Sequence, residues 1–191
     1  MIENLVILDN VISKKYANDI ENLVLGDEFP WYFKSDITYN TVEFGQNCNP
    51  GFGHQLFFEK YQSPHWPFFI PLLYQAVENI DYNLKTIMNS RLFMQIPNIT
   101  DKLHNNAHVD GITSHMVALY YVTDSDGPTY IFEANSSNTN QFESQLLNSK
   151  THNHITVDPK KGRLVFFNGK HFHASSAPKN STRCVLNYNF L

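Results

Sequence analysis

The sequence has little cysteine: only Cys48 and Cys184 occur among 191 residues, and they lie far apart. Two distant cysteines cannot form the disulfide framework of a small secreted domain. The N-terminus also shows no basic region ahead of an apolar run, which a signal peptide would need. We therefore expect a cytoplasmic protein in a reducing environment.

The sequence also lacks an excess of basic residues, and it has no long hydrophobic run. Lys and Arg number 14 against 18 Asp and Glu, so the formal net charge is -4, and the basic surface that nucleic acids require is not indicated. No apolar run approaches the ~18 residues that a membrane-spanning helix needs. The expected partner is a small molecule or a protein, with neither nucleic acid nor membrane involved.

Short strand-like segments are abundant instead. Amphipathic patterns predict helices over residues 13–25, with Ser13 as N-cap, and over 66–80, with a proline near the first turn. From about residue 91 onward, strand-like segments alternate with turn signals such as DSDGP and DPKKG. We expect one domain over 1–191, mainly β (α+β), with a jelly roll over 91–191 supported by helices and strands of 1–90.

His108 and Asp110 form the first candidate site. Residues two apart on an extended chain point to the same side, so both side chains can reach one metal ion. Alone, such a pair is more often an ordinary polar pair. A third ligand from a distant strand would change this, and His171 and His173 are both candidates. Two histidines and one carboxylate form the facial triad of non-haem Fe(II) oxygenases.

Arg183 lies ten residues after His173 on the last predicted strand. Three open metal positions can take a bidentate 2-oxo acid and then dioxygen, and a guanidinium is well matched to the far carboxylate of such an acid. Strand parity places Arg183, Val185, Asn187 and Asn189 on one face. This alternation predicts a polar cavity on that face and helices covering the other.

Several motifs resemble one family. HVD (108–110), ALYYVTDSDGPTYIFE (118–133), PKKGRLVFFNGKHFHASSAP (159–178) and the following Arg183 resemble the Fe(II)/2-oxoglutarate dioxygenases of the prolyl 4-hydroxylase type, in their compact bacterial and phage form. The resemblance covers residues 91–191 well. It implies a double-stranded β-helix (jelly roll), and a location in the host cytoplasm if a phage encodes the protein.

The resemblance also implies residue roles. Iron would be bound by His108, Asp110 and His173, and Arg183 would bind the C5 carboxylate of 2-oxoglutarate. The remaining co-substrate contacts would come from Tyr121, donating to the same carboxylate, from Thr129, lining the pocket, and from Asn187, near the iron-side end. Many relatives place a tyrosine ten to twelve residues before the metal histidine, where this chain has Ile96 and Asn98 instead.

The implied activity is hydroxylation of a C–H bond, with formation of succinate and CO2. The implied substrate is a prolyl residue in a peptide or protein, O2 is consumed, and ascorbate is a further candidate cofactor. A free amino acid or small metabolite is the alternative substrate, and a non-catalytic jelly-roll binding module is the alternative function. The loop at 45–53 is a candidate substrate lid. We expect the remaining partnerless histidines to be exposed: His104, His115, His152 and His154.

Overall fold

The computed structural model describes residues 1–37, 49–98, 100, 102–111, 113–139 and 147–191, and strands predominate within these ranges. The elements in chain order are β1 (Val6–Leu8), α1 (Lys14–Val24), β2 (Tyr32–Lys34), β3 (Gly51–Phe58), β4 (Tyr61–Gln62), α2 (Trp66–Glu78), β5 (Ile87–Gln95), β6 (Met116–Tyr121), β7 (Thr129–Asn135), β8 (His154–Val157), β9 (Leu164–Asn168), β10 (His171–Ser175) and β11 (Arg183–Phe190).

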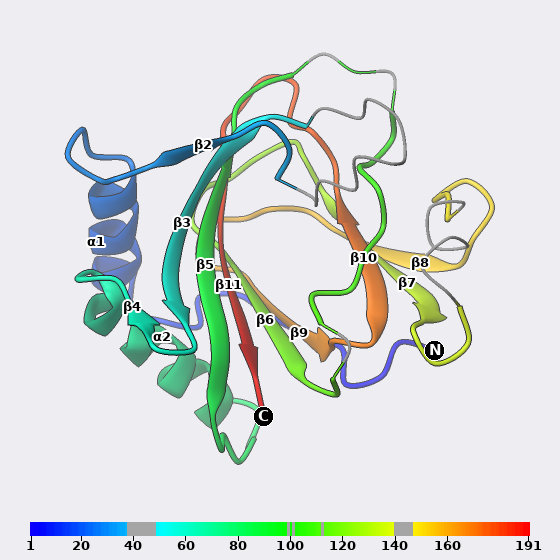
Figure 1. Cartoon of the computed structure of the whole chain (residues 1–191), viewed down its shortest axis with the longest axis horizontal. Coiled ribbons are helices and arrows are strands. Elements are labelled where there is room, and N and C mark those ends of the chain that lie inside the picture. Colours follow the sequence, from blue (N-terminus) through cyan, green and yellow to red (C-terminus); the bar gives the residue numbers. More distant parts are fainter. Residues whose placement is uncertain (38–48, 99, 101, 112, 140–146) are drawn as a thin grey trace.

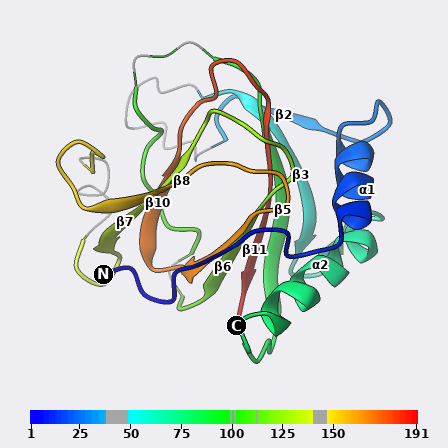
Figure 2. The same ribbon diagram turned by 180° about the vertical axis from the view of Figure 1, so that it is seen from behind.

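The strands form two antiparallel sheets that lie opposite each other (Figure 1). The larger sheet has the order β1-β9-β6-β11-β5-β3-β2, with β4 paired to β3, and the smaller has the order β10-β7-β8. Viewed from behind, the first strand runs along the β9 edge (Figure 2). This arrangement is a double-stranded β-helix with supporting N-terminal helices, and it confirms the mainly β prediction.

Both predicted helices form, close to the predicted bounds. The Ser13 hydroxyl accepts a hydrogen bond from the Tyr16 backbone N–H at 3.2 Å, which caps α1 as expected. Pro67 lies in the first turn of α2, where a backbone N–H has no helical partner to lose. Neither helix in the described ranges is long and apolar enough to cross a membrane.

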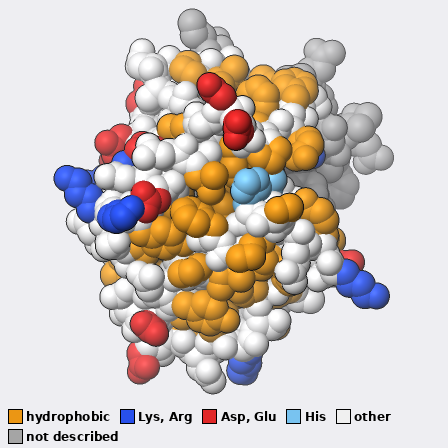
Figure 3. Space-filling model, turned by 90° about the vertical axis from the view of Figure 1, so that its left-hand side faces the viewer, with side chains coloured by type: hydrophobic (Ala, Val, Ile, Leu, Met, Phe, Trp, Pro, Cys, Tyr) orange, Lys and Arg blue, Asp and Glu red, His pale blue; other side chains and the backbone are white. Residues whose placement is uncertain are grey.

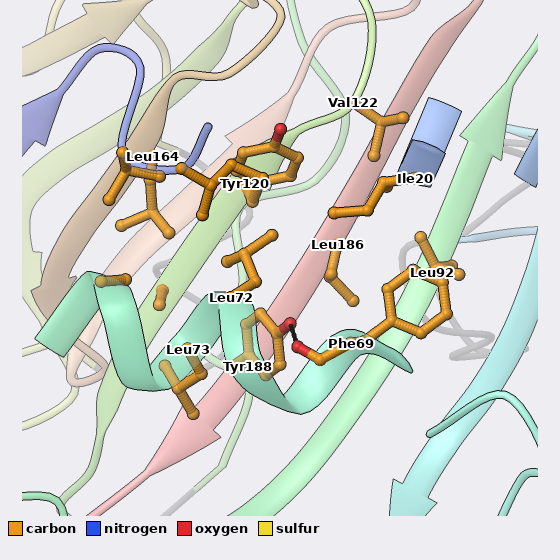
Figure 4. Packing of buried hydrophobic residues seen from close by; sticks show 14 of the residues in the cluster. Ile20, Phe69, Leu72, Leu73, Leu92, Tyr120, Val122, Leu164, Leu186 and Tyr188 are labelled. Carbon is orange, nitrogen blue, oxygen red and sulfur yellow. Dashed lines mark hydrogen bonds between the residues drawn. The ribbon is translucent and has the colours of Figure 1, made fainter. Parts of the chain in front are cut away.

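The helices cover one face of the larger sheet. Phe69, Leu72 and Leu73 of α2 point onto β11, where they meet Leu186 and Tyr188 (Figure 4). The Tyr188 hydroxyl donates to the Phe69 carbonyl at 2.6 Å, so even the polar atom in this contact is satisfied. Cys184 and Phe190 belong to the same buried cluster. The predicted parity of the last strand is therefore confirmed on its outer face.

A second apolar cluster lies between the two sheets. It joins residues of the larger sheet, such as Val117 and Phe167, to Ile131 and Val157 of the smaller one. All four side chains are at most 2% exposed. This cluster leaves the space around Arg183 and Asn187 to polar side chains, which is where the site lies.

Two predicted boundaries in the N-terminal half of the chain differ in the structure, and one hypothesis about this half lies outside the described residues. The predicted loop at 45–53 ends earlier than expected, because Gly51 already begins β3. Residues 38–48, including Cys48, are outside the described residues, so the lid hypothesis stays a prediction. The fifth strand begins at Ile87, four residues before residue 91, where the strand-rich part of the chain is expected to begin, because its pairing with β11 continues as far as Phe190.

Candidate metal centre

Three residues expected from spacing converge in the folded chain. One side-chain ligand atom from each of His108, Asp110 and His173 lies within 4.8 Å of the others. The backbone of His108 forms an isolated antiparallel bridge with His173, through N–H to carbonyl bonds of 3.0 and 2.9 Å. This bridge brings the two imidazoles side by side, with ring centroids 4.6 Å apart.

The imidazoles present the same nitrogen to the cluster. Nδ1 of His108 lies 3.2 Å from the Asn106 carbonyl, and Nδ1 of His173 lies 3.3 Å from the His171 carbonyl. A carbonyl can only accept, so these contacts favour the proton on Nδ1 and a lone pair on Nε2. Each Nε2 lies 3.9 Å from an oxygen of Asp110. The geometry thus places two nitrogen lone pairs opposite one carboxylate.

Electrostatics keep these groups in the protonation states that a metal site needs. Burial, reinforced by the neighbouring His108, lowers the pKa of His173 to about 4. Burial also lowers the pKa of His108, although the charge of Asp110 opposes that effect. Burial alone would raise the pKa of Asp110, but Arg91, His173 and His108 hold it well below its usual range. Neutral imidazoles and an ionised carboxylate are the forms that bind metal.

Asp110 is held by donors from two neighbouring strands. Arg91 of β5 donates from Nη2 to Oδ1 at 2.7 Å, and Asn187 of β11 donates from Nδ2 to Oδ2 at 2.7 Å. With its amide oriented to satisfy both of its polar atoms, Asn189 also donates to Oδ2, at 3.1 Å. These bonds fix the carboxylate plane, as partners of metal ligands commonly do.

His171, the alternative third ligand, does not join the cluster. Its Nδ1 lies 2.9 Å from the Phe132 carbonyl, and its Nε2 accepts from the Glu3 backbone N–H at 3.1 Å. The side chain is buried, with 1% exposure. The strand register shifts between His171 and His173, which turns the two rings toward different partners.

Arg183 provides a buried positive charge. It is 3% exposed and donates to the Gly127 carbonyl at 2.9 Å, to Gln95 Oε1 at 3.0 Å and to Thr129 Oγ1 at 2.8 Å. All three acceptors are neutral, and within the described part of the chain no carboxylate pairs with this guanidinium. Burial lowers its pKa, but an arginine stays charged near neutral pH. A desolvated cation without a counter-ion favours an anionic ligand.

Thr129 is well placed to complete an anion site. Its Oγ1 accepts from the Tyr121 hydroxyl at 2.7 Å as well as from Arg183. Because both lone pairs of the hydroxyl are used, its own proton is left to donate elsewhere. Tyr121 is fully buried and stands behind Thr129, with its ring 5.7 Å from the guanidinium carbon. Its hydroxyl therefore acts on Thr129 rather than directly on the hollow.

A single hollow of about 70 Å³ connects these groups. Its described lining includes the predicted residues His108, Asp110, Thr129, His173, Arg183 and Asn187, together with Ile37, Arg91, Phe93, Leu119, Ser175 and Val185. Tyr121 is not among them. The inward face predicted for the last strand is thus a polar wall shared by the three-residue cluster and the buried arginine.

Sequence reasoning missed Arg91 and Gln95, two polar residues of β5 that bond to Asp110 and Arg183. Both pair across to β11, Arg91 with Asn187 and Gln95 with Arg183. Their alternation with Leu92 and Met94 was a usable signal, since it matches the parity found on β11. His115 was also misjudged, because it is 4% exposed and its ring packs against Gly169. His152 is exposed as expected, whereas His104 and His154 are half-buried.

Comparison with known proteins relates the chain to others through structure alone. No family model matches the sequence, and no curated protein sequence matches it. An oxidoreductase of the 2OG-Fe(II) oxygenase family from Burkholderia pseudomallei superposes with a TM-score of 0.68 at 10% identity, covering 97% of this chain and 84% of that chain.

Two further solved structures show the range of similar proteins. A prolyl-4-hydroxylase from Pseudomonas putida has a TM-score of 0.60 at 11% identity, covering 98% of this chain and 92% of that one. The alpha ketoglutarate dependent carbocyclase SnoK from nogalamycin biosynthesis has a TM-score of 0.63 at 11% identity, covering 98% and 79%. At sequence identities this low, the structural similarity establishes a shared fold.

Proposed function

We propose that this protein is an Fe(II)- and 2-oxoglutarate-dependent oxygenase. The observation that carries the proposal is one hollow lined at once by the His108, Asp110 and His173 cluster and by the buried Arg183, which pairs with no carboxylate among the described residues. A structural polar pair would need neither a third ligand nor a neighbouring buried cation. The fold shared with the B. pseudomallei oxidoreductase supports the same activity.

In this proposal His108, Asp110 and His173 bind the metal through two neutral nitrogens and one carboxylate oxygen. This ligand set suits ferrous iron and leaves coordination positions open for co-substrate and dioxygen. The bound iron, together with 2-oxoglutarate and O2, supplies the oxidising power that cleaves a C–H bond. Arg91, Asn187 and Asn189 orient the Asp110 carboxylate toward the ion.

Arg183 and Thr129 bind the far carboxylate of 2-oxoglutarate. The guanidinium offers positive charge. The Thr129 hydroxyl offers its own proton, because it accepts from both Tyr121 and Arg183 and its proton has no other partner among these contacts. Tyr121 is a positioning residue in this account, because its hydroxyl fixes the orientation of Thr129. The hydrogen bond from Asn187 to Asp110 supports the proposal that Asn187 lies near the iron-side end of the co-substrate.

The finer proposal is hydroxylation, with succinate and CO2 as co-products. A prolyl residue in a peptide or protein is one substrate, supported by the sequence motifs and by the fold shared with the P. putida prolyl-4-hydroxylase. A small metabolite is the second candidate, and the charges around the site favour it. Ascorbate as a supporting reductant and the cytoplasm as the location stay predictions.

Turnover of 2-oxoglutarate tests the proposal directly. Protein supplied with Fe(II), 2-oxoglutarate and air is expected to form succinate slowly even without a substrate, as measured by NMR or mass spectrometry. His173→Ala and Asp110→Ala should abolish this turnover, whereas His152→Ala, which changes an exposed histidine, should leave it unchanged. Folded wild-type protein that forms no succinate above the level of the Asp110→Ala variant would contradict the proposed function.

A further inference from the structure

A second hollow, here called the trough, lies next to the metal centre on the same face of the larger sheet. Its volume is about 240 Å³, near the lower end of the range typical of small-molecule sites, roughly 300–1,000 Å³. We infer that the trough binds a small substrate that carries a carboxylate on a flat apolar body. The role as substrate rests on the proposed function, while binding itself does not. The lining consists of Tyr32, Lys34, Gly53, His54, Gln55, Tyr61, Arg91, Leu92 and Phe93.

Strand register explains why this face is hollow. Gly53 of β3 pairs with Tyr32 on one side and with Phe93 on the other, and paired residues point to the same face. A Cβ at Gly53 would meet Lys34 Cε at 3.5 Å and Phe93 Cδ1 at 3.7 Å. The glycine thus forms a low floor between two walls of long side chains.

The trough joins the metal centre through shared residues. Arg91 and Phe93 line both hollows. The guanidinium carbon of Arg91 lies 5.0 Å from the centre of the Phe93 ring, and Nη2 of the same residue donates to Asp110. A molecule in the trough that contacts Arg91 is therefore separated from the metal ligands by a single side chain. A substrate would extend from the trough past Arg91 and Phe93 into the first hollow, because the C–H bond to be cleaved must lie beside the metal.

The charges that line the two hollows do not balance. Lys34, Arg91 and Arg183 are cationic, and Asp110 is the one acidic residue in the described linings. A ferrous ion and the dianion of 2-oxoglutarate would cancel each other, which leaves a surplus of two positive charges. Asp36 lies close enough to raise the pKa of His108, but it lines neither hollow. Even with its charge included, the surplus remains positive.

Two hydrogen-bond donors on the cationic residues of the trough have no acceptor within the described part of the chain. No acceptor for Lys34 Nζ is found there, and its side chain lies along the floor at Gly53. The Nε atom of Arg91 is buried without a hydrogen-bond partner. Lys34 and Arg91 both line the trough, so a carboxylate bound there would meet two positive charges, and burial strengthens such charge-assisted bonds.

The walls favour a flat apolar body. Tyr32 and Tyr61 line the outer part of the trough and are 58% and 50% exposed, although aromatic side chains usually bury more of their surface. Phe93 lines the inner part. A planar ligand lying on these rings would cover them, while its carboxylate reached the two cations.

A matched pair of probes tests the inference. 3-Phenylpropanoate and 3-phenylpropanamide share one body and differ in charge, and their affinities for the full chain can be measured by titration NMR without iron or 2-oxoglutarate. The acid is expected to bind about tenfold more tightly than the amide, the effect of one favourable ion pair. Lys34→Met should remove most of this difference, whereas Lys14→Met, which changes an exposed lysine on α1, should not.

A second variant and a peptide probe test the position of the ligand and the choice of a small molecule. Gly53→Val should weaken binding of both probes, because its side chain occupies the floor. Equal affinity for acid and amide, absence of binding by either, or an unchanged preference in Lys34→Met would overturn the inference. Tighter binding of a blocked prolyl tripeptide than of the acid would overturn the choice of a small molecule. Because the assay omits iron and co-substrate, its failure is distinguishable from a failure of succinate formation.

Discussion

Arg183 carries a positive charge where water cannot solvate it. Its three acceptors are a backbone carbonyl, an amide oxygen and a hydroxyl, so the protein orients the charge without neutralising it. Burying a charge in this way costs free energy unless a partner arrives. The site is therefore prepared for an anion, and in the proposed function that anion is 2-oxoglutarate.

We expect Arg183→Lys to weaken 2-oxoglutarate binding by at least about tenfold, because an ammonium group cannot reproduce the planar donor set of a guanidinium. Isothermal titration calorimetry of the metal-loaded protein measures this change. Arg163→Lys is the matched control, since Arg163 pairs with Asp9 on another surface. Equal losses of affinity in the two variants would argue against a specific role for Arg183.

The sequence predicted the cluster with His173 as its third member, although strand alternation alone left His171 as an alternative. Both lie two residues apart on one strand, and regular alternation would point them to the same side. The register shift between them decides the matter, and a shift of this kind arises from pairing with another strand. Arg91 was missed for a similar reason, because its role depends on its position opposite Asn187.

The turn that precedes β7 holds the arginine in place. Asp126 accepts hydrogen bonds from the backbone of Lys179 and Asn180 and from the side chains of Asn180 and Ser181. The next residue, Gly127, supplies the carbonyl that binds Arg183, and a Cβ there would lie 2.7 Å from the Ser176 carbonyl oxygen. Hydrogen bonds therefore join the turn at Asp126 to the turn at 179–181, beside Arg183.

The stability that these hydrogen bonds contribute depends on pH, because Asp126 must be ionised to accept them all. Burial would raise its pKa, but hydrogen bonds from Ser181 and Asn180 lower it from 3.8 to about 2. A carboxyl group with a lowered pKa in the folded state contributes stability above its unfolded pKa, and this contribution is lost as the pH falls through the folded value. The wild type should therefore lose stability between about pH 4 and pH 2.

Asp126→Asn should remove that part of the acid sensitivity. At pH 6 the variant should be less stable by on the order of 1 kcal/mol, a value discounted because the carboxylate is exposed. Urea unfolding at pH 6 and at pH 2.5 measures both effects, with Asp27→Asn, at an exposed position, as the control. A variant as stable as the wild type at pH 6 would show that the turn is held by other contacts.

The second helix stabilises the fold from the face opposite the site. Leu72 is fully buried between α2 and the larger sheet, so Leu72→Ala should lower the free energy of unfolding by about 3 kcal/mol. Tyr74→Ala, on the exposed face of the same helix, should change it by less than about 0.5 kcal/mol. Co-substrate affinity should be retained in folded Leu72→Ala protein, and its loss would mean that the site depends on helix packing.

The molecule as a whole divides its two faces between stability and chemistry. On one side of the larger sheet the helices cover an apolar core, and on the other side lie the two hollows with the charged residues of the site. The side of the molecule that carries the helices, β2 and β4 shows broad apolar areas (Figure 3). Phe33 of β2 and Phe68 and Tyr74 of α2 are exposed. The sequence predicted this division through strand parity, since alternation needs only local information.

Sequence could not predict the trough or the charge surplus around it. Tyr32, Gly53 and Arg91 are far apart along the chain, and only the strand order β5-β3-β2 brings them together. The chain carries a net charge of -4, yet most of the charged residues that line its hollows are cations: Lys34, Arg91 and Arg183 against Asp110. Local charge at the site therefore opposes the overall charge, which favours anionic ligands in the hollows.

The most direct test of the central claim is an anaerobic titration of the protein with Fe(II) and 2-oxoglutarate, followed by visible absorption. The account predicts a weak charge-transfer band that saturates at one equivalent of iron, is absent in His173→Ala, and needs more 2-oxoglutarate in Arg183→Lys. Folded wild-type protein that shows no band, or an undiminished band in His173→Ala, would contradict the assignment of this site.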